Sequence, residues 1–298
     1  QIVHNLEFDY VVIDEAGRAT PAETLVPAVR GRKIIMVGDQ KQLPPMVDNN
    51  LTNDLLGTIN LSRDQLTYTI FEKLFTELPD QLRCVLKGQY RMHPTIGQLI
   101  SEAFYDAQLV SNTKQDKKNH KLRWWPKAVI WFSTSNKDNR TEEPVGKSKQ
   151  NSCEARFIEE LLVDIEQQYR SLNLTKKIAL ITGYLAQKSL LKTVIDVEDT
   201  NRWTALEIEV DTVDAFQGRE TDIVIYSVVR SNDRNEIGFI GDHRRLNVAL
   251  SRAKELLVIV GDLGFVTQAR VYDGTNPFIP VAKYINSNNN ECLIEVIK

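Results

Sequence analysis

The stretch YVVIDEAGRATPAETLVPAVRGRKIIMVGD, residues 10–39, decides the fold. The apolar run Val11–Ile13 predicts a short buried strand. A threonine, a proline and a glutamate in capping positions then predict a helix over Pro21–Arg30, and a second apolar strand is predicted at Lys33–Asp39. Strand, helix and strand in this order form the right-handed crossover unit of a parallel α/β sheet.

Polar side chains follow both of these strands. Asp14 and Glu15 follow the first strand, whereas Asp39 ends the second and Gln42 comes three residues later. Because ligands collect outside the carboxyl ends of parallel strands, we expect these side chains to share one rim. An aspartate at a strand tip can hold a hydrated Mg²⁺, and the next carboxylate can orient a water for attack on a terminal phosphoryl group. The alternative is that the two acids only stabilise the N-terminus of the following helix.

The composition limits the class of protein. The chain has 298 residues, 42% of them hydrophobic and 26% charged, which is enough for two domains of ordinary size. It contains no apolar run of membrane-spanning length and no signal-peptide pattern, and its three cysteines lack metal-ligand spacing. These features predict a soluble protein of a reducing compartment inside the cell. With a net charge of −3, any surface that binds nucleic acid must be local.

A second series of apolar segments predicts another parallel sheet. Helical patterns, including a long one at residues 152–169, separate several of these segments. Strands are predicted at residues 128–134, 177–182, 209–213, 222–229 and 256–262. We place the domain boundary near residues 83–88, which gives a first domain over residues 1–85 and a second over residues 86–298. The predicted fold class is therefore α/β, with two parallel-sheet domains in tandem.

A polar insertion near residues 112–150 interrupts the second domain. Its first half is rich in lysine and arginine, and Trp124 and Trp125 lie among these charges. Tryptophan rings beside cations can stack on nucleic-acid bases. The alternative is a solvated loop whose two tryptophans pack on the second domain.

Two further stretches with useful side chains follow predicted strands. VGDQKQLPP, residues 37–45, carries the uncharged Gln42, which can hydrogen-bond a phosphate or its attacking water. TVDAFQGRETD, residues 212–222, places Gln217 and Glu220 around a glycine turn between two strands.

Two more stretches are associated with predicted helices. GQYRMHP, residues 88–94, places Tyr90 next to Arg91 just before a helix. RRLNVALSRAKE, residues 244–255, predicts a helix from whose side Arg252 projects. Any one of the four stretches could serve the fold alone, but their joint order is harder to explain in that way.

In this order the stretches resemble the motifs of the superfamily 1 helicases, specifically the up-frameshift-like branch of RNA and DNA helicases. VVIDEAGRAT resembles motif II and VGDQKQLPP motif III, while QYRMHP, TVDAFQGRE and RRLNVALSRAK resemble motifs IV, V and VI. The resemblance implies two RecA-like domains that clamp ATP and act on single-stranded RNA or DNA. It also implies that ATP hydrolysis is coupled to unwinding, with 5′ to 3′ translocation.

The resemblance implies roles for three residues of the first domain. Asp14 would hold Mg²⁺, Glu15 would be the general base for the attacking water, and Gln42 would sense the γ-phosphate of ATP. A two-metal nuclease at the same rim is disfavoured, because nothing supplies the extra ligands.

Further roles fall in the second domain. Tyr90 would stack on the adenine, Arg91 would reach the phosphates and Arg252 would be the arginine finger. Glu220, with Gly218 beside it, would meet the ribose side of the nucleotide. A guanidinium offers bidentate donors and a permanent charge, which suits both arginine roles. Since the arginines and the acids belong to different domains, hydrolysis would report domain closure.

Candidate contacts to nucleic acid lie at two predicted strand ends. Thr182 and Thr212 would bind phosphates of the strand without reading its sequence. The family usually has a proline after the position of Thr182, and Gly183 stands there in this chain, although Tyr184 and Gln187 keep to the family pattern. The alternative for both threonines is an ordinary strand-end residue.

The chain departs from the family upstream of motif II. The loop G-x-x-x-x-G-K-[ST], whose amides and lysine hold the phosphates, is absent, and the GKS run at Gly146–Ser148 lacks both its first glycine and a preceding strand. We therefore expect an incomplete first domain in the C-terminal part of a larger helicase, inactive alone, with the loop in an upstream part of the same polypeptide. The alternative is a non-catalytic, helicase-derived module that binds nucleic acid or serves as a scaffold.

Overall fold

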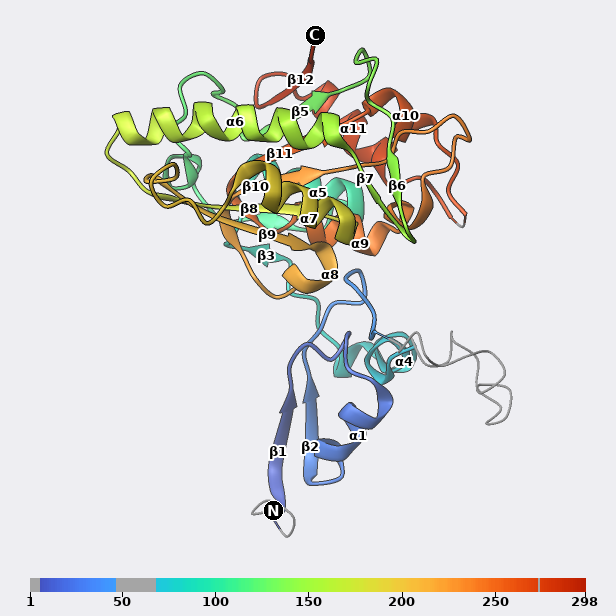
Figure 1. The fold of residues 1–298 in the computed structure, drawn as a ribbon. Helices are drawn as coiled ribbons and strands as arrows, with labels where there is room; N and C mark the ends of the chain where they lie inside the picture. The colour runs from blue at the N-terminus through green and yellow to red at the C-terminus, as the bar shows by residue number, and fades with distance from the viewer. Residues whose placement is uncertain (1–5, 47–67, 273) are drawn as a thin grey trace. The chain divides into compact units, whose positions relative to one another are not determined.

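The computed structural model describes residues 6–46, 68–272 and 274–298 (Figure 1). The chain divides into two compact units, Gln1–Leu86 and Lys87–Lys298. Each unit has its own sheet, so each is described by itself.

The first unit contains the strand, helix and strand that the sequence predicts. β1 (Phe8–Ile13) and β2 (Gly31–Met36) pair in parallel, with Ile13 opposite Met36, and α1 (Pro21–Ala28) connects them. The capping box at Thr20 is confirmed: its hydroxyl accepts from the amide of Glu23, whose carboxylate accepts from the amide of Thr20. The described part of the unit also contains α4 (Ile70–Glu77) and the short helix η1 (Asp80–Leu82).

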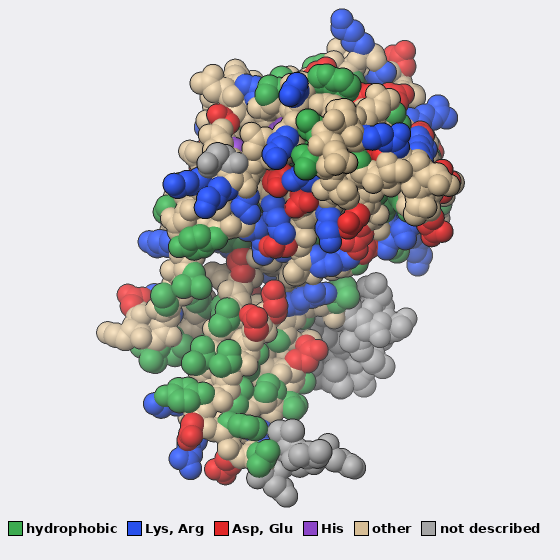
Figure 2. Space-filling view, turned by 90° about the vertical axis from the view of Figure 1, so that its left-hand side faces the viewer, with side chains coloured by type: hydrophobic (Ala, Val, Ile, Leu, Met, Phe, Trp, Pro, Cys, Tyr) green, Lys and Arg blue, Asp and Glu red, His purple; other side chains and the backbone are tan. Residues whose placement is uncertain are grey.

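The described residues of the first unit bury little apolar surface. Its core cluster consists of Ile13, Ala16, Ala28 and Phe71. In contrast, Tyr10 is 56% exposed and Val12 63% exposed on β1, and Ile34 and Ile35 of β2 are also exposed. Figure 2 shows hydrophobic side chains gathered on the surface of this unit. β1 and β2 pair only with each other in the part of the chain that is described, so there the outer edge of each strand lacks a partner strand.

The second unit is built on a six-stranded parallel sheet with the order β12-β5-β11-β10-β8-β9. Its strands are β5 (Val129–Ser133), β8 (Lys176–Thr182), β9 (Leu206–Thr212), β10 (Thr221–Ser227), β11 (Ala253–Gly261) and β12 (Cys292–Val296). The central strands β10 and β11 are apolar over most of their length because helices cover both faces of the sheet. The five strands predicted from the sequence are confirmed, and β12 is an additional edge strand.

Helices form a layer on each face of this sheet (Figure 1). On one face, α6 (Ser152–Ser171) and α7 (Leu185–Ile195) pack into the main core cluster. On the other face, α5 (Pro94–Phe104) and α9 (His243–Leu250) contact β11 and β10. The helices α8 (Val213–Phe216), α10 (Leu263–Gln268) and α11 (Phe278–Ser287) complete the unit. None of the helices in the described ranges is both long enough and apolar enough to span a membrane.

The prediction of a helix over residues 244–255 is wrong at its C-terminal end. α9 ends at Leu250, and β11 begins at Ala253. Ala253 and Leu257, whose spacing continues the apolar pattern of the predicted helix, therefore belong to a buried strand.

The insertion near residues 112–150 contains local structure of its own. β6 (Glu143–Val145) and β7 (Ser148–Gln150) form an antiparallel hairpin, and Gly146 occupies its turn with a φ of +57°. The GKS run at Gly146–Ser148 is thus the tip of a hairpin, and the short strand β6 precedes it although the sequence predicted no strand there. A phosphate-binding loop instead connects a strand to a helix N-terminus, so this run does not have that geometry.

Candidate nucleotide site

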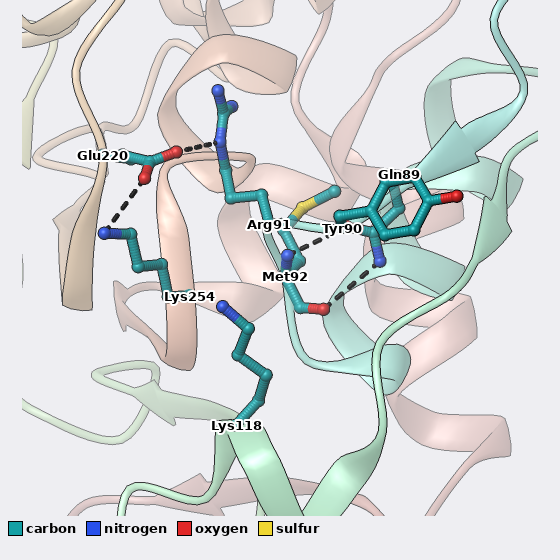
Figure 3. Close-up of a pocket in the computed structure, with 7 residues that line it drawn as sticks. All are labelled: Gln89, Tyr90, Arg91, Met92, Lys118, Glu220 and Lys254. Carbon is teal, nitrogen blue, oxygen red and sulfur yellow. Dashed lines mark hydrogen bonds and ion pairs between the residues drawn. The ribbon is translucent and has the colours of Figure 1, made fainter.

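A pocket of about 520 Å³ lies entirely within the second unit. It is lined by Gln89, Tyr90, Arg91, Met92, Lys118, Glu220 and Lys254 (Figure 3). Glu220 directly precedes β10 and Lys254 lies at the start of β11, and these two strands are neighbours in the sheet. The pocket is therefore at the amino ends of the central strands.

The turn that presents Tyr90 and Arg91 is fixed by its neighbour Gln89. This turn connects β3 (Gly88–Gln89), which pairs with β4 (Val110–Ser111), to α5. The side chain of Gln89 makes both hydrogen bonds to the backbone of Met92. Its Nε2 donates to the Met92 carbonyl at 3.2 Å, and its Oε1 accepts from the Met92 N–H at 2.9 Å. The ring of Tyr90 is 71% exposed. A large aromatic ring on a fixed turn offers a stacking surface for a planar group.

Charge in the pocket is concentrated on Glu220 and the cations around it. Arg91 Nε lies 2.6 Å from one carboxylate oxygen of Glu220, and Lys254 Nζ lies 3.0 Å from the other. The hydrogen bond from Lys254, and then the hydrogen bond and charge of Arg91, hold the pKa of Glu220 below its usual value. Glu220 is therefore a carboxylate at neutral pH.

A third cation, Lys118, lines the same pocket and has no ion pair within the described residues. It belongs to the short helix η2 (Gln115–Lys118) of the insertion, and Figure 3 shows its side chain directed toward the other lining residues. The lining thus carries three cations against one carboxylate. This excess of positive charge suits a polyanion.

The sequence predicted three of these lining residues: Tyr90, Arg91 and Glu220 lie together as expected. Lys118 and Lys254 were missed. The available signals were the basic run of the insertion for Lys118 and, for Lys254, its place next to the start of a strand beside Glu220. Gly218, which was predicted beside Glu220, does not line the pocket and lies in the preceding turn with a φ of +81°.

Arg252 does not project toward solvent as the sequence predicted. Its side chain is buried at 2% exposure. Its Nε donates to the Val248 carbonyl at 3.0 Å, Nη1 donates to the Arg219 carbonyl at 3.4 Å, and Nη2 donates to the Ser251 hydroxyl at 3.0 Å. α9 ends at Leu250, so Arg252 is not on that helix. Its guanidinium is buried between the end of α9 and the turn before β10, and its hydrogen bonds connect the two.

This position predicts that Arg252→Ala destabilises the second unit. The substitution removes a buried side chain together with its hydrogen bonds to the Val248 and Arg219 carbonyls, which is expected to lower the free energy of unfolding by about 2–4 kcal/mol. Urea unfolding followed by circular dichroism measures the change. Arg234→Ala, at an exposed position, is the matched control with an expected change of about 0.5 kcal/mol or less. A loss below about 1 kcal/mol for Arg252→Ala would show that these hydrogen bonds are dispensable.

The predicted acids of the first unit lie at the carboxyl end of β1. Asp14 and Glu15 are both exposed, and Asp14 Oδ1 accepts from the Glu15 amide at 2.9 Å. Glu15 has a φ of +51°, a left-handed conformation that marks a sharp change of chain direction after the strand. Both carboxylates are therefore presented to solvent at the strand tip.

Two glycines bring the loops after β1 and β2 together. The Ala16 amide donates to the Val37 carbonyl at 2.8 Å, so the two strand exits run side by side. A Cβ at Gly38 would lie 2.6 Å from the Gly17 amide nitrogen, and a Cβ at Gly17 would lie 2.9 Å from a backbone oxygen of the second loop. Only residues without a side chain permit this approach.

The structure places Gln42 at the same end of this sheet. Its Nε2 donates to Asp39 Oδ2 at 2.9 Å, and Asp39 Oδ1 accepts from the Lys41 amide at 2.9 Å. Asp39 therefore shapes its own loop. The shared rim predicted for Asp14, Glu15, Asp39 and Gln42 corresponds to the carboxyl ends of β1 and β2.

The residues of this rim fit one mode of Mg²⁺ binding. Among the described residues there is no group of three or more metal-ligating side chains that could hold a metal ion. Mg²⁺ is often bound by one or two carboxylates, with waters and substrate phosphates as its other ligands. The exposed carboxylate of Asp14 fits that mode, and a cage made only of protein ligands does not occur in the described ranges.

The two threonines at strand ends are side by side in the second unit. Thr182 ends β8, Thr212 ends β9, and they are paired in the register of the two strands. Both are buried, and the Thr182 hydroxyl accepts from the Tyr184 amide at 3.4 Å. At the carboxyl ends of β8 and β9, the surface that reaches solvent is formed by the residues that follow the two strands.

The two tryptophans of the insertion differ in their surroundings. Trp125 packs against the core, with its ring edge-on to Phe132 at a centroid distance of 5.9 Å. Trp124 is 58% exposed. The packing alternative thus describes Trp125, and only Trp124 has a ring available for stacking.

Comparison with known proteins identifies the family. The profile of a family described as "AAA domain" matches residues 66–264, and another of the same description matches residues 1–50. Helicase sen1 of Schizosaccharomyces pombe is 33% identical over 87% of this chain and 15% of its own length. Regulator of nonsense transcripts 1 of Caenorhabditis elegans is 36% identical over 85% of this chain and 23% of its own length.

A DNA helicase and a solved structure extend the comparison. DNA polymerase alpha-associated DNA helicase A of S. pombe is 31% identical over 88% of this chain and 38% of its own length. A solved PRRSV helicase structure aligns over 84% of this chain and 34% of its own, with a TM-score of 0.40 and 17% identity. The chain thus spans well under half of each of these proteins.

The two family profiles define the class as an AAA-type domain. The chain belongs to the superfamily 1 helicases, in their up-frameshift-like branch.

Proposed function

We propose that the protein containing this chain is an ATP-dependent helicase that couples ATP hydrolysis to 5′ to 3′ translocation on RNA or DNA and to its unwinding. The observation that carries this proposal is the pocket of the second unit, where an exposed tyrosine ring lies beside three cations. That combination suits a nucleotide, which has a planar base at one end and a polyphosphate at the other.

Each lining side chain has a role in this proposal. The Tyr90 ring stacks on the adenine, and Arg91 and Lys118 bind phosphate oxygens. Glu220 accepts from the ribose hydroxyls while its salt bridges to Arg91 and Lys254 keep it ionised. Arg91 is the better candidate for the arginine finger, because Arg252 is buried under the chain.

The first unit supplies the hydrolytic groups. Asp14 holds Mg²⁺, Glu15 takes the proton of the attacking water, and Gln42 responds to the γ-phosphate. Mg²⁺ would supply charge neutralisation at the phosphates. The exposed position of Asp14 and Glu15 after β1 supports these roles, because both carboxylates are free to meet a ligand.

We further propose that another part of the same polypeptide supplies the phosphate-binding loop. The one GKS run of this sequence is a hairpin turn. Among the described residues, the sheet of β1 and β2 has exposed side chains and no third strand, which fits a sheet that is completed by further polypeptide. On this proposal the 298-residue chain alone has little or no ATP turnover.

The test is ATP hydrolysis by the native polypeptide, measured with and without single-stranded RNA and DNA. Stimulation by a single strand, together with unwinding of a duplex that carries a 5′ overhang, is the expected result. A native polypeptide that binds strands but hydrolyses no ATP would instead support the non-catalytic module.

Lys118→Ala is expected to weaken ATP binding by the native polypeptide about tenfold, the loss of one charge-assisted hydrogen bond to a phosphate. Titration with a fluorescent ATP analogue measures the change. Lys117→Ala, in the same short helix but outside the pocket lining, is the matched control. Adenosine affinity should change little, because adenosine has no phosphates. Equal losses for both lysines would show that only the general charge of the insertion matters.

A further inference from the structure

The chain after β8 is in unusually close contact with a short helix from another part of the second unit. This helix, η3 (Gly238–Gly241), packs directly on Gly183. A Cβ at Gly183 would lie 2.8 Å from Ile240 Cγ2 and 3.2 Å from Phe239 Cε2. The departure from the family pattern at this position therefore makes room for η3.

This contact holds the Phe239 ring in place. The Tyr184 ring lies 4.6 Å from it at an angle of 59°, and the Arg245 guanidinium lies over it at 5.2 Å. The Tyr184 hydroxyl accepts from Arg230 Nη1 at 3.3 Å. Ile240, the residue after Phe239, is fully buried.

Yet Phe239 is 42% exposed. Tyr184, Arg245 and the buried Ile240 restrict its motion, while part of the ring remains in contact with water. The neighbouring Leu185, at the start of α7, is also exposed. A ring that is held in place and is partly exposed to water loses little conformational entropy when another planar group stacks on it.

The ring lies at the carboxyl end of β8. The Tyr184 amide donates to the hydroxyl of Thr182, the last residue of that strand. Arg245 forms salt bridges with Asp214 and Asp242, which hold its guanidinium over the ring. Proteins that bind single strands without sequence preference place aromatic rings where successive bases can stack, often with an arginine in contact.

We propose that Phe239, backed by Tyr184 and Arg245, is the stacking platform for one base of a bound single strand. The inference rests on the proposed function, since it assigns a contact to the nucleic acid on which the helicase acts. It locates base stacking at η3, outside the two threonines that the sequence proposed as nucleic-acid contacts.

Binding of a labelled single-stranded oligonucleotide to the native polypeptide, measured by fluorescence anisotropy, tests the platform. Phe239→Ala is expected to weaken binding about tenfold, within the range for loss of one base–aromatic stack. Phe239→Leu keeps apolar volume at the contact with Gly183 but lacks a π-face, so it should lose nearly as much. Phe239→Trp should bind at least as tightly as the parent protein. Ile279→Ala, at an exposed apolar position of α11, is the control for surface hydrophobicity, and its binding should not change.

A series of oligonucleotides, each with one abasic site, identifies the stacked base. One position should weaken binding by the parent protein about tenfold and have no further effect on Phe239→Ala, because both changes remove the same stack. Thermal unfolding of each variant verifies that the fold is retained. Wild-type affinity in Phe239→Leu would overturn the platform and leave the proposed function standing. An absence of single-strand binding by the parent protein would overturn both.

Discussion

Glu15→Gln in the native polypeptide is expected to lower ATP turnover by about 10²- to 10⁴-fold, the contribution of a positioned general base. The glutamine keeps the size of the side chain but cannot accept the proton of the attacking water. ATP binding should persist, because Asp14 and the pocket residues are unchanged. A steady-state phosphate-release assay measures turnover, and titration with a fluorescent ATP analogue measures binding.

Glu7→Gln is the matched control for this substitution. Glu7 is an exposed glutamate of the same unit, just before β1, and lies far along the strand from its carboxyl end. The control should hydrolyse ATP at the parent rate. If Glu15→Gln keeps more than about a tenth of that rate, another group accepts the proton and the assignment of the base is wrong.

Arg91→Ala is expected to lower turnover by about 10³- to 10⁵-fold, the range for an arginine that stabilises charge in phosphoryl transfer. Arg91 Nε binds Glu220, and the side chain lines the pocket at 35% exposure. A partly exposed salt bridge adds little stability, so the free energy of unfolding should change by about 1 kcal/mol or less. Arg91→Lys, which keeps the charge but loses the planar pair of donors, should give an intermediate rate.

The control for Arg91 is Arg83→Ala, which removes an arginine of similar exposure that pairs with Asp80. Its turnover should be unchanged. The decisive comparison is with Arg252→Lys, provided that this variant is folded. Loss of turnover in Arg252→Lys with full turnover in Arg91→Ala would restore Arg252 as the arginine finger.

The elements that the sequence predicts best are those with one dominant physical cause. The strands β8, β10 and β11 are continuous apolar runs bounded by polar residues, and α1 begins at a complete capping box. These signals are local. The edge strand β12 was missed because it is short, only partly buried and paired with β5 alone.

The wrong end of α9 also has a physical explanation. β11 is buried on both faces, so it is apolar at consecutive positions and satisfies a helical period as well as a strand period. Ala253 and Leu257 therefore continued the helical spacing of apolar residues that begins in α9. Without that helix, the guanidinium of Arg252 finds its acceptors in neighbouring backbone and stays buried.

The candidate site also contains some residues that the sequence predicts and others that it does not. Tyr90 and Glu220 were predicted from a family resemblance, although they are far apart in sequence, and the structure brings them to one pocket. Lys118 could not be selected from its sequence, because a cation in a polar loop has no periodicity that indicates its direction. Only the packing of η2 beside the turn before α5 shows which lysine of the basic run lines the pocket.

The sheet of β1 and β2 has a consequence for work with the isolated chain. A small parallel sheet whose edges have no partner strand in the described ranges, and whose side chains such as Tyr10, Val12 and Ile35 are exposed, is a template for additional strands of any origin. Such a surface promotes self-association and precipitation, and it also attracts chaperones. Loss of soluble chain during purification would therefore reflect this open sheet and not a failure of the second unit to fold.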